Sequence, residues 1–388
     1  MLGVLLARAG VKTLVLEKHS DFLRDFRGDT IHPSTLAVMD ELGWLDELLT
    51  LPHQPVRTLV AMFGTTPLAL ADFSHLPGRA KFIAMMPQWD FLSFLARKGA
   101  LSPKFSLLMG TAANGLVLDG GRVTGVTAKG ENGALTIAAD LVVAADGRTS
   151  LLRAAAGLRS DDFGAPMDVM WFRLPRRPAD TDQTQARFDG GRIFVMLNRG
   201  DYWQCASVIA KGMNERVRAA GLPAFRAAVG AALPFDAKRA DAITTWDEVK
   251  LLTVKVDRLR QWARPGLLCI GDAAHAMSPV GGVGINLAIQ DAVATANLLA
   301  KNLRDGRLTD DDVKRVQARR DWPTRMTQRL QLAMQNAIIA PALSATGTIT
   351  PPQVLRLLTS VPFANRLPAR LLGLGFRPEH VAKHVLVA

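Results

Sequence analysis

The sequence predicts an α/β fold in which a lobe with a parallel sheet is interrupted by an α+β lobe, and three observations predict it. A helix over residues 2–9 leads into a strand over residues 11–16 that ends in Glu17, which is the second half of a βαβ unit. The continuous apolar run at residues 141–145 is typical of a buried parallel strand. The same pattern returns at residues 267–270, so we expect the first lobe to be discontinuous.

Helices and short strands follow in the first lobe. Pro33 suits the first turn of a helix and Gly43 suits its end. Helices are predicted over residues 33–42 and 88–96. Strands are predicted over residues 58–62, 82–86, 105–109, 116–118, 123–127 and 135–137. Glycine-containing turns separate the last three of these strands from one another and predict a β-meander.

Longer strand candidates define the second lobe. Strands are predicted over residues 167–174, 192–197, 202–209 and 249–254, with two helices before the last. We therefore predict three units, namely a discontinuous first domain, an inserted second domain and a C-terminal helical segment. Their residues are 1–165 with 263–345, 166–262, and 346–388, respectively.

Composition places the chain among folded proteins of one large domain or two. It has 388 residues, of which 48% are hydrophobic and 21% charged. The formal net charge is +12, and residues 301–388 hold 14 basic and 6 acidic side chains. These basic side chains lie along a predicted helix that Thr309 caps, without interleaved aromatics, so we expect a solvated helix face and no nucleic-acid partner. The residues in question are Lys314, Arg315, Arg319, Arg320, Arg325 and Arg329.

Membrane, disulfide and metal signals are weak in this sequence. The longest uncharged stretch, residues 330–355, contains glutamine, asparagine and proline, which argues against a spanning helix. The apolar start has no basic leader, so we expect no signal peptide and a cytoplasmic location. Cys205 and Cys269 lie far apart without a CxxC pair, and no histidine pair has a third ligand at metal spacing.

The strongest functional signal follows the strand at residues 267–270. The sequence there reads Cys-Ile-Gly-Asp-Ala-Ala-His-Ala-Met-Ser-Pro-Val-Gly-Gly-Val-Gly-Ile-Asn, from Cys269 to Asn286. The strand delivers Asp272 at its carboxyl end, where open α/β sheets bind ligands. A loop with Pro279 and several glycines lets backbone approach a ligand, and a helix begins near Gly284. The free N–H groups of that helix favour negative charge.

This segment resembles the GD motif of FAD-dependent aromatic hydroxylases, the group A flavoprotein monooxygenases typified by para-hydroxybenzoate hydroxylase. The resemblance implies a Rossmann-like FAD-binding domain with an inserted α+β substrate domain. It implies that Asp272 contacts the ribityl and ribose region of FAD. It also implies that the backbone of Gly284, Ile285 and Asn286 faces the pyrimidine end of the flavin, with Pro279 in the same loop.

Two further segments match the family in order. Residues 144–153 resemble its DG motif, which implies that Asp146 lies near the FAD pyrophosphate and the path of NAD(P)H; by itself, an Asp-Gly after a strand is more often a turn. The resemblance also implies flavin or cofactor contacts for Arg27 and Gln88, the alternatives being a loop arginine and a helix-capping glutamine. Glu17, at its strand end, is the expected acceptor for a ribose hydroxyl, with Lys18 beside it.

The chain departs from the family at three places, and in the third the short tail after residues 367–372 disfavours the phenol-hydroxylase subgroup that carries an extra thioredoxin-like domain. The G-x-G-x-x-G loop that should precede the first helix is absent, because the sequence begins inside that helix. We expect either a start codon assigned too late or a real truncation, and the second would weaken FAD binding. Tyr202 is the only tyrosine, so the paired-tyrosine relay of the para-hydroxybenzoate enzyme is not expected.

These observations predict an FAD-dependent monooxygenase, acting as a monomer or homodimer. The resemblance implies that NAD(P)H reduces the flavin, that O2 forms a C4a-hydroperoxyflavin, and that an aromatic or polyketide-like small molecule is hydroxylated. One alternative is a flavin-dependent reductase or dehydrogenase of the same fold. Another is a truncated, flavin-poor pseudoenzyme that acts as a binding protein. The sequence does not identify the substrate, the choice between NADH and NADPH, or a catalytic residue.

Overall fold

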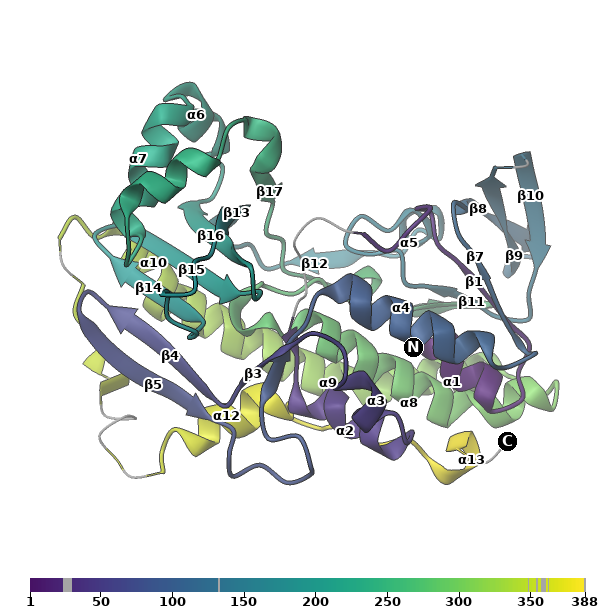
Figure 1. Cartoon of the computed structure of the whole chain (residues 1–388). Helices are drawn as coiled ribbons and strands as arrows, with labels where there is room; N and C mark the ends of the chain where they lie inside the picture. The colour runs from purple at the N-terminus through teal and green to yellow at the C-terminus, as the bar shows by residue number, and fades with distance from the viewer. Residues whose placement is uncertain are drawn as a thin grey trace.

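Strands from distant parts of the chain lie side by side in this computed structural model of the protein (Figure 1). β11 (Val142–Ala144) pairs in parallel with β20 (Leu267–Cys269), and Ala144 lies opposite Cys269. The prediction that these two buried strands share one parallel sheet is confirmed. The structure describes residues 1–23, 30–131, 133–347, 349–353, 355–356, 361 and 363–386.

The first helix and strand pack closely, as the βαβ pattern predicts. α1 (Leu2–Arg8) lies against β1 (Thr13–Leu16), and a Cβ atom on Gly3 would come within 2.6 Å of Val15. β1 pairs in parallel with β7 (Phe105–Leu108). In the described residues these two strands form a sheet separate from that of β11 and β20. The expected absence of a first strand stays a prediction.

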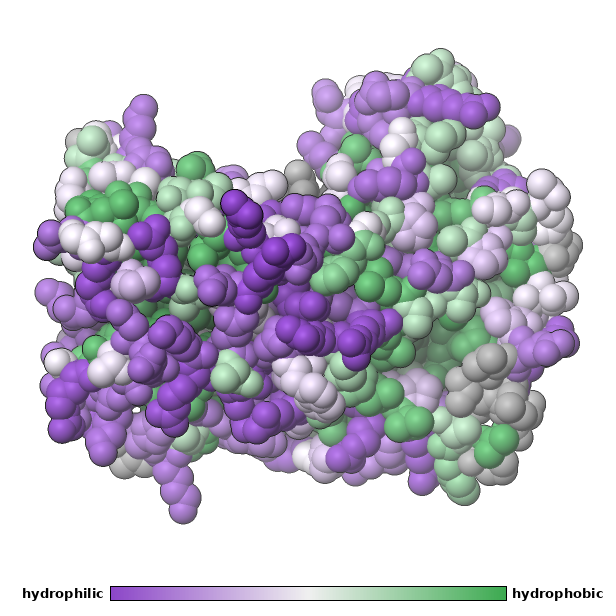
Figure 2. All heavy atoms as spheres, turned by 180° about the vertical axis from the view of Figure 1, so that it is seen from behind, coloured by the Kyte–Doolittle hydropathy of each residue, from purple (hydrophilic) through white to green (hydrophobic). Residues whose placement is uncertain are grey.

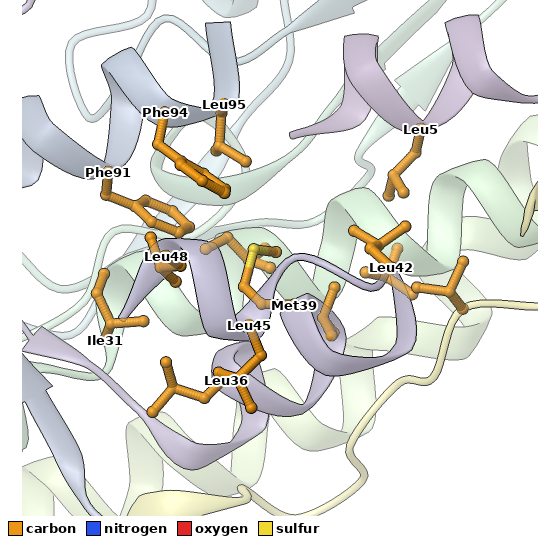
Figure 3. Close-up of a cluster of buried hydrophobic side chains, with 14 of the residues drawn as sticks. Leu5, Ile31, Leu36, Met39, Leu42, Leu45, Leu48, Phe91, Phe94 and Leu95 are labelled. Carbon is orange, nitrogen blue, oxygen red and sulfur yellow. The ribbon is translucent and has the colours of Figure 1, made fainter. Parts of the chain in front are cut away.

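The β-meander and the early helices are confirmed. β8 (Ala112–Asp119), β9 (Arg122–Gly130) and β10 (Gly133–Ala138) form an antiparallel sheet in the order β10-β9-β8. α2 (Pro33–Glu41) and α4 (Gln88–Ala100) begin at the predicted residues. Leucine, methionine and phenylalanine side chains from α1, α2, α3 (Leu45–Leu48) and α4 converge on one buried cluster (Figure 3).

A seven-stranded sheet dominates the second lobe, with α6 (Asn214–Ala219) and α7 (Leu222–Ala232) packed on it (Figure 1). Its order is β17-β13-β16-β15-β14-β4-β5. β4 and β5 come from the N-terminal part of the chain, and β4 joins by parallel pairing with β14. The predicted domain boundaries stay a prediction. The strands are β4 (Thr58–Phe63), β5 (Thr66–Asp72), β13 (Met167–Pro175), β14 (Gln185–Asp189), β15 (Arg192–Asn198), β16 (Tyr202–Ala210) and β17 (Lys250–Leu252).

Two long helices, α8 (Gly284–Arg304) and α9 (Asp310–Met334), run beneath both lobes (Figure 1). Thr309 caps α9 by accepting a hydrogen bond from the Asp312 N–H, as predicted. Lys314 and Arg315 point to solvent, with 69% and 64% of their side chains exposed. The prediction of a wholly solvated basic face is wrong for Arg320, which is fully buried because two carboxylates neutralise it.

One helical stretch, 280–304, is long and apolar enough to cross a membrane by length and composition, and 67% of its window is buried inside the fold. This burial is typical of a core helix. On the face opposite to that of Figure 1, hydrophilic side chains gather across the middle, with smaller apolar groups between them (Figure 2).

Shorter elements connect these units. The remaining strands are β2 (Thr30–Ile31), β3 (Gln54–Val56), β6 (Ile83–Met85), β12 (Ser160–Asp162), β18 (Asp257–Leu259) and β19 (Ala263–Arg264). Within the described ranges, the other helices are α5 (Leu151–Ala155), α10 (Ala340–Ser344), α12 (Arg366–Gly373) and α13 (Lys383–Leu386). There are 3-10 turns at Ala237–Ala242, Trp246–Glu248, Gly271–Ala273 and Val280–Gly282 and a π-helical turn at Gln335–Ile339.

Candidate functional site

Asp272 stands at the carboxyl end of β20, where the sequence predicts a ligand-binding carboxylate. The chain turns there through Gly271, whose φ of +58° favours glycine, and a Cβ atom at that position would come within 3.0 Å of Ala288. The Asp272 side chain is 31% exposed. Its Oδ2 accepts a hydrogen bond from Arg148 Nη2 at 3.2 Å. The carboxylate is therefore accessible and already faces a cation.

The first residue of α8 lies beside that carboxylate. A Cβ atom on Gly284 would be 4.0 Å from Asp272 Oδ1. Among the described residues, no side chain caps this end of the 21-residue helix, so its first N–H groups and the positive end of its dipole are available to a ligand. Asp272 and the start of α8 are therefore adjacent in the structure.

The loop between them, residues 276–282, is tied to β2. Gly282 has a φ of +62°, and a Cβ atom there would come within 2.4 Å of Thr30 Oγ1, which donates to the Gly282 carbonyl at 2.9 Å. The Asn286 amide group donates to the carbonyls of Thr30 and Gly282. It also accepts hydrogen bonds from the His32 N–H and the Thr35 hydroxyl. The Asn286 side chain thus links the loop and α8 to β2 and α2. Its backbone is left for the predicted cofactor contact.

Asp146 reaches the same sheet edge on β11 but has a local partner. Its Oδ2 accepts hydrogen bonds from the N–H groups of Leu151 and Leu152, at 2.9 and 3.2 Å, and so caps α5. Between Asp146 and α5 lies Arg148, which the sequence analysis gave no role. The sequence signal that could have identified Arg148 is its position directly after an Asp-Gly turn at the end of a buried strand.

The other predicted contacts come from separate elements. Glu17 and Lys18 follow β1, and Glu17 Oε1 accepts a hydrogen bond from the His19 N–H at 2.9 Å. Gln88 opens α4 directly after β6, whose Met85 pairs with Thr30 of β2. Arg27 lies outside the described residues. The cofactor roles of all these residues, and of Pro279, stay predictions.

A buried charge network holds the Gly271 turn, and the sequence analysis missed it. Asp291 on α8 accepts hydrogen bonds from the Gly271 N–H at 3.0 Å, from His275 Nε2 at 2.6 Å and from Arg320 Nε at 3.0 Å. Burial alone would raise the pKa of Asp291, but His275 and Arg320 lower it overall. Arg320 also pairs with Glu379, which links the turn to the C-terminal segment.

His32 and Cys269 are uncharged groups near the site. Burial lowers the pKa of His32 from 6.5 to about 4, although its Nδ1 lies 2.8 Å from the Leu372 carbonyl. Burial, with a smaller effect of Asp146, raises the pKa of the Cys269 thiol to about 12. The thiol is therefore no nucleophile at neutral pH. Within the described ranges, no three histidine, cysteine or acidic side chains converge as metal ligands.

A family model described as an FAD binding domain matches residues 1–328. The chain belongs to this FAD-binding family. The 6-methylpretetramide 4-monooxygenase of Streptomyces rimosus is 33% identical over 353 residues, covering 90% of this chain and 84% of the relative. The 2-heptyl-3-hydroxy-4(1H)-quinolone synthase of Mycobacteroides abscessus is 28% identical, covering 80% and 82%. The predicted resemblance to FAD-dependent aromatic hydroxylases is confirmed, and the FAD-binding protein is an oxidoreductase.

Solved structures agree with this fold. PqsL, a probable FAD-dependent monooxygenase from Pseudomonas aeruginosa, superposes with a TM-score of 0.73 at 20% identity, covering 88% of this chain and 94% of PqsL. The OxyS anhydrotetracycline hydroxylase from Streptomyces rimosus also gives 0.73, at 21% identity, covering 97% and 74%. At these identities the likeness shows the shared fold.

The groups around Asp272 fit FAD. A half-exposed carboxylate accepts hydrogen bonds from ribityl hydroxyls, an uncapped helix end attracts negative charge, and a glycine backbone allows close approach. Asp272, the start of α8 and Gly281–Gly282 supply these three features together.

Proposed function

We propose that this FAD-dependent monooxygenase uses NAD(P)H and O2 to hydroxylate an aromatic, polyketide-like small molecule. The observation that carries the proposal is the uncapped start of α8 beside the accessible Asp272 carboxylate. The name of the Streptomyces rimosus relative, a 6-methylpretetramide monooxygenase, supports the substrate class.

Bound FAD supplies the redox chemistry, by taking electrons from NAD(P)H and delivering one oxygen atom of O2 to the substrate. In the proposed complex, Asp272 accepts hydrogen bonds from the ribityl chain. The first N–H groups of α8 stabilise negative charge at the pyrimidine end of the ring, by up to about 2 kcal/mol in a partly buried geometry. Arg148 Nη2 donates to Asp272 Oδ2 and so fixes the direction of that carboxylate.

An apolar sheet face supplies the proposed substrate wall. Ala61, Phe63 and Phe188 of β4 and β14 belong to a buried cluster of the seven-stranded sheet, and Val280 of the loop packs against it. The rings of Phe63 and Phe188 stack with centroids 4.7 Å apart. Such a surface excludes water and accepts a flat ring system. We propose that this sheet face, next to loop 276–282, forms one wall of the reaction space.

The decisive experiment combines cofactor binding with oxygen tracing. The 388-residue protein is purified, titrated with FAD, and incubated with NADH or NADPH and a panel of polycyclic aromatic polyketides under 18O2. We expect substrate-stimulated oxidation of one nicotinamide cofactor, with one labelled oxygen atom in the product. Oxidation without a labelled product would favour the reductase alternative, and absence of FAD binding would favour the pseudoenzyme.

A further inference from the structure

Three glutamines on one face of the long helix α9 are buried without being part of the predicted site. Gln328 and Gln331 lie in α9, and Gln335 begins the π-helical turn that follows it. Their exposed fractions are 1%, 3% and 0%. Spacings of three and four residues place their side chains on the same helix face. Buried amides require hydrogen-bond partners, so these partners indicate what the face serves.

Gln331 is bonded to the middle of loop 276–282. Its Nε2 donates to the carbonyls of Ser278 and Val280, both at 2.9 Å, and its Oε1 accepts from the Ser278 N–H at 3.2 Å. One side chain therefore satisfies three backbone groups of the loop.

The neighbouring glutamines bond to the first part of the same loop, and Gln328 also donates to the Asp257 carbonyl at 2.8 Å. Gln328 Nε2 donates to the Ala276 carbonyl at 3.1 Å. Gln335 Nε2 donates to the Ser278 hydroxyl oxygen at 2.6 Å. π-helical turns are rare and often occur at functional sites. Gln328, Gln331 and Gln335 form a row, the glutamine row, that is hydrogen-bonded to the loop from its first residue, Ala276, to its centre.

This loop joins Asp272 to the start of α8, which are the two features that carry the proposed function. Any movement of residues 276–282 changes the spacing between that carboxylate and the helix end. We propose that Gln328, Gln331 and Gln335 are positioning residues that set this spacing for the cofactor. The proposal rests on the proposed function for the identity of the cofactor, but the ordering of the loop is testable without it.

Gln317 provides a matched control on the same helix. Its Oε1 accepts from the Trp262 N–H and its Nε2 donates to the Arg260 carbonyl, both at 2.9 Å. It therefore bonds a backbone segment with the same group and similar geometry, away from loop 276–282. Gln317 is partly exposed whereas Gln331 is buried, so Gln317→Met controls for the loss of a glutamine–backbone tie on α9 and not for burial.

The test is amide hydrogen exchange of the full chain without FAD. In Gln331→Met we expect peptides covering residues 276–283 to exchange about tenfold faster, because the loop loses three hydrogen bonds at once. Gln317→Met should leave those peptides at the wild-type rate. Equal effects in the two variants, or no effect in Gln331→Met, would overturn the proposal. If Gln331→Met does not fold, Gln335→Met removes only the bond to the Ser278 hydroxyl and should give a smaller acceleration at the same peptides, and no acceleration would contradict the proposal.

A second measurement connects the loop to the cofactor. With FAD added, Gln331→Met should raise the dissociation constant about tenfold and shift the visible flavin absorption, because the helix end no longer faces the ring in one geometry. Gln317→Met should match the wild type in both. Failure of the wild type to bind FAD contradicts the proposed function, whereas unchanged loop exchange contradicts only the positioning role.

Discussion

His32 is a buried, neutral side chain whose protonation we expect to destabilise the protein. Its pKa in the folded chain is about 4, compared with 6.5 in the unfolded chain. Between these values the unfolded chain binds the proton and the folded chain does not, so stability falls as the pH falls. We expect the free energy of unfolding to drop by about 3 kcal/mol from pH 7 to pH 4 through this residue.

His32→Gln should flatten that part of the pH profile. Denaturant titrations of both proteins at several pH values between 7 and 4 measure it. Parallel profiles for His32→Gln and the wild type would contradict the assignment.

Asp291 contributes more than His32 to the free energy of unfolding, because its three hydrogen-bond partners are buried with it. Asp291→Asn leaves Arg320 without a full counter-charge, and breaking a buried ion pair in this way costs about 3–5 kcal/mol. The pKa of Asp291 is lowered, so this stabilisation is present above its unfolded value of 3.8 and is lost as the pH falls further. Urea unfolding at pH 7 measures the effect.

Asp46→Asn is the control for that experiment. It removes an exposed ion pair with Arg79 and should change the midpoint little. A loss in Asp291→Asn no larger than in this control would show that the buried network is not stabilising.

The sequence correctly places Asp272 at the end of a buried strand, while its cofactor role stays a prediction, and the predicted exposure of Arg320 is wrong. A carboxylate at the end of an apolar strand, ahead of glycines and a helix, has few structural alternatives. An arginine on a polar helix gives no sign of burial, because the carboxylates that neutralise it come from α8 and from Glu379 far along the chain. Hydrophobic periodicity does not report such partners.

Among the elements, the loop before α8 offers the sharpest test of cofactor positioning. Gly282→Ala places a Cβ atom 2.4 Å from Thr30 Oγ1 at a φ of +62°. We expect the FAD affinity to fall by about tenfold or more, since backbone shifts near a bound group are costly. Isothermal titration with FAD measures it.

Gly120→Ala is matched to this change, because Gly120 also has a positive φ but nothing lies within 4 Å of the added Cβ atom. It should destabilise the meander turn by about 1 kcal/mol and leave FAD affinity unchanged. Equal losses of affinity in the two variants would contradict a specific role for the loop.

Most elements were predictable from local signals, but their assembly was not. Thr309, Pro33 and the glycine turns mark ends that local chemistry determines. The parallel pairing of β4 with β14 joins residues more than a hundred positions apart. No periodicity encodes such pairing, because it depends on which strand edges remain free after the rest of the sheet has formed. The polar core face of α9 was equally invisible to a hydrophobic pattern.

For the whole molecule, FAD binding and folding should be linked. A ligand that binds only the folded chain stabilises it by about 2.7 kcal/mol at a free concentration 100 times its dissociation constant. We therefore expect the unfolding midpoint to rise with FAD concentration, as measured by thermal scans that follow tryptophan fluorescence. Riboflavin is the control, because it has the ring and ribityl chain but lacks the adenosine diphosphate. An unchanged midpoint at saturating FAD would argue against cofactor binding by this chain.

The glutamine row on α9 also bears on how the site responds to acid. Loop 276–282 is held by neutral amide groups, which do not ionise between pH 3 and 10, whereas the adjoining Gly271 turn is held by the Asp291 carboxylate. Protonation of Asp291, whose pKa lies below its ordinary value, therefore weakens the hold on the Gly271 turn while the hydrogen bonds of the glutamine row are kept. The two halves of the segment thus differ in whether a proton can release them.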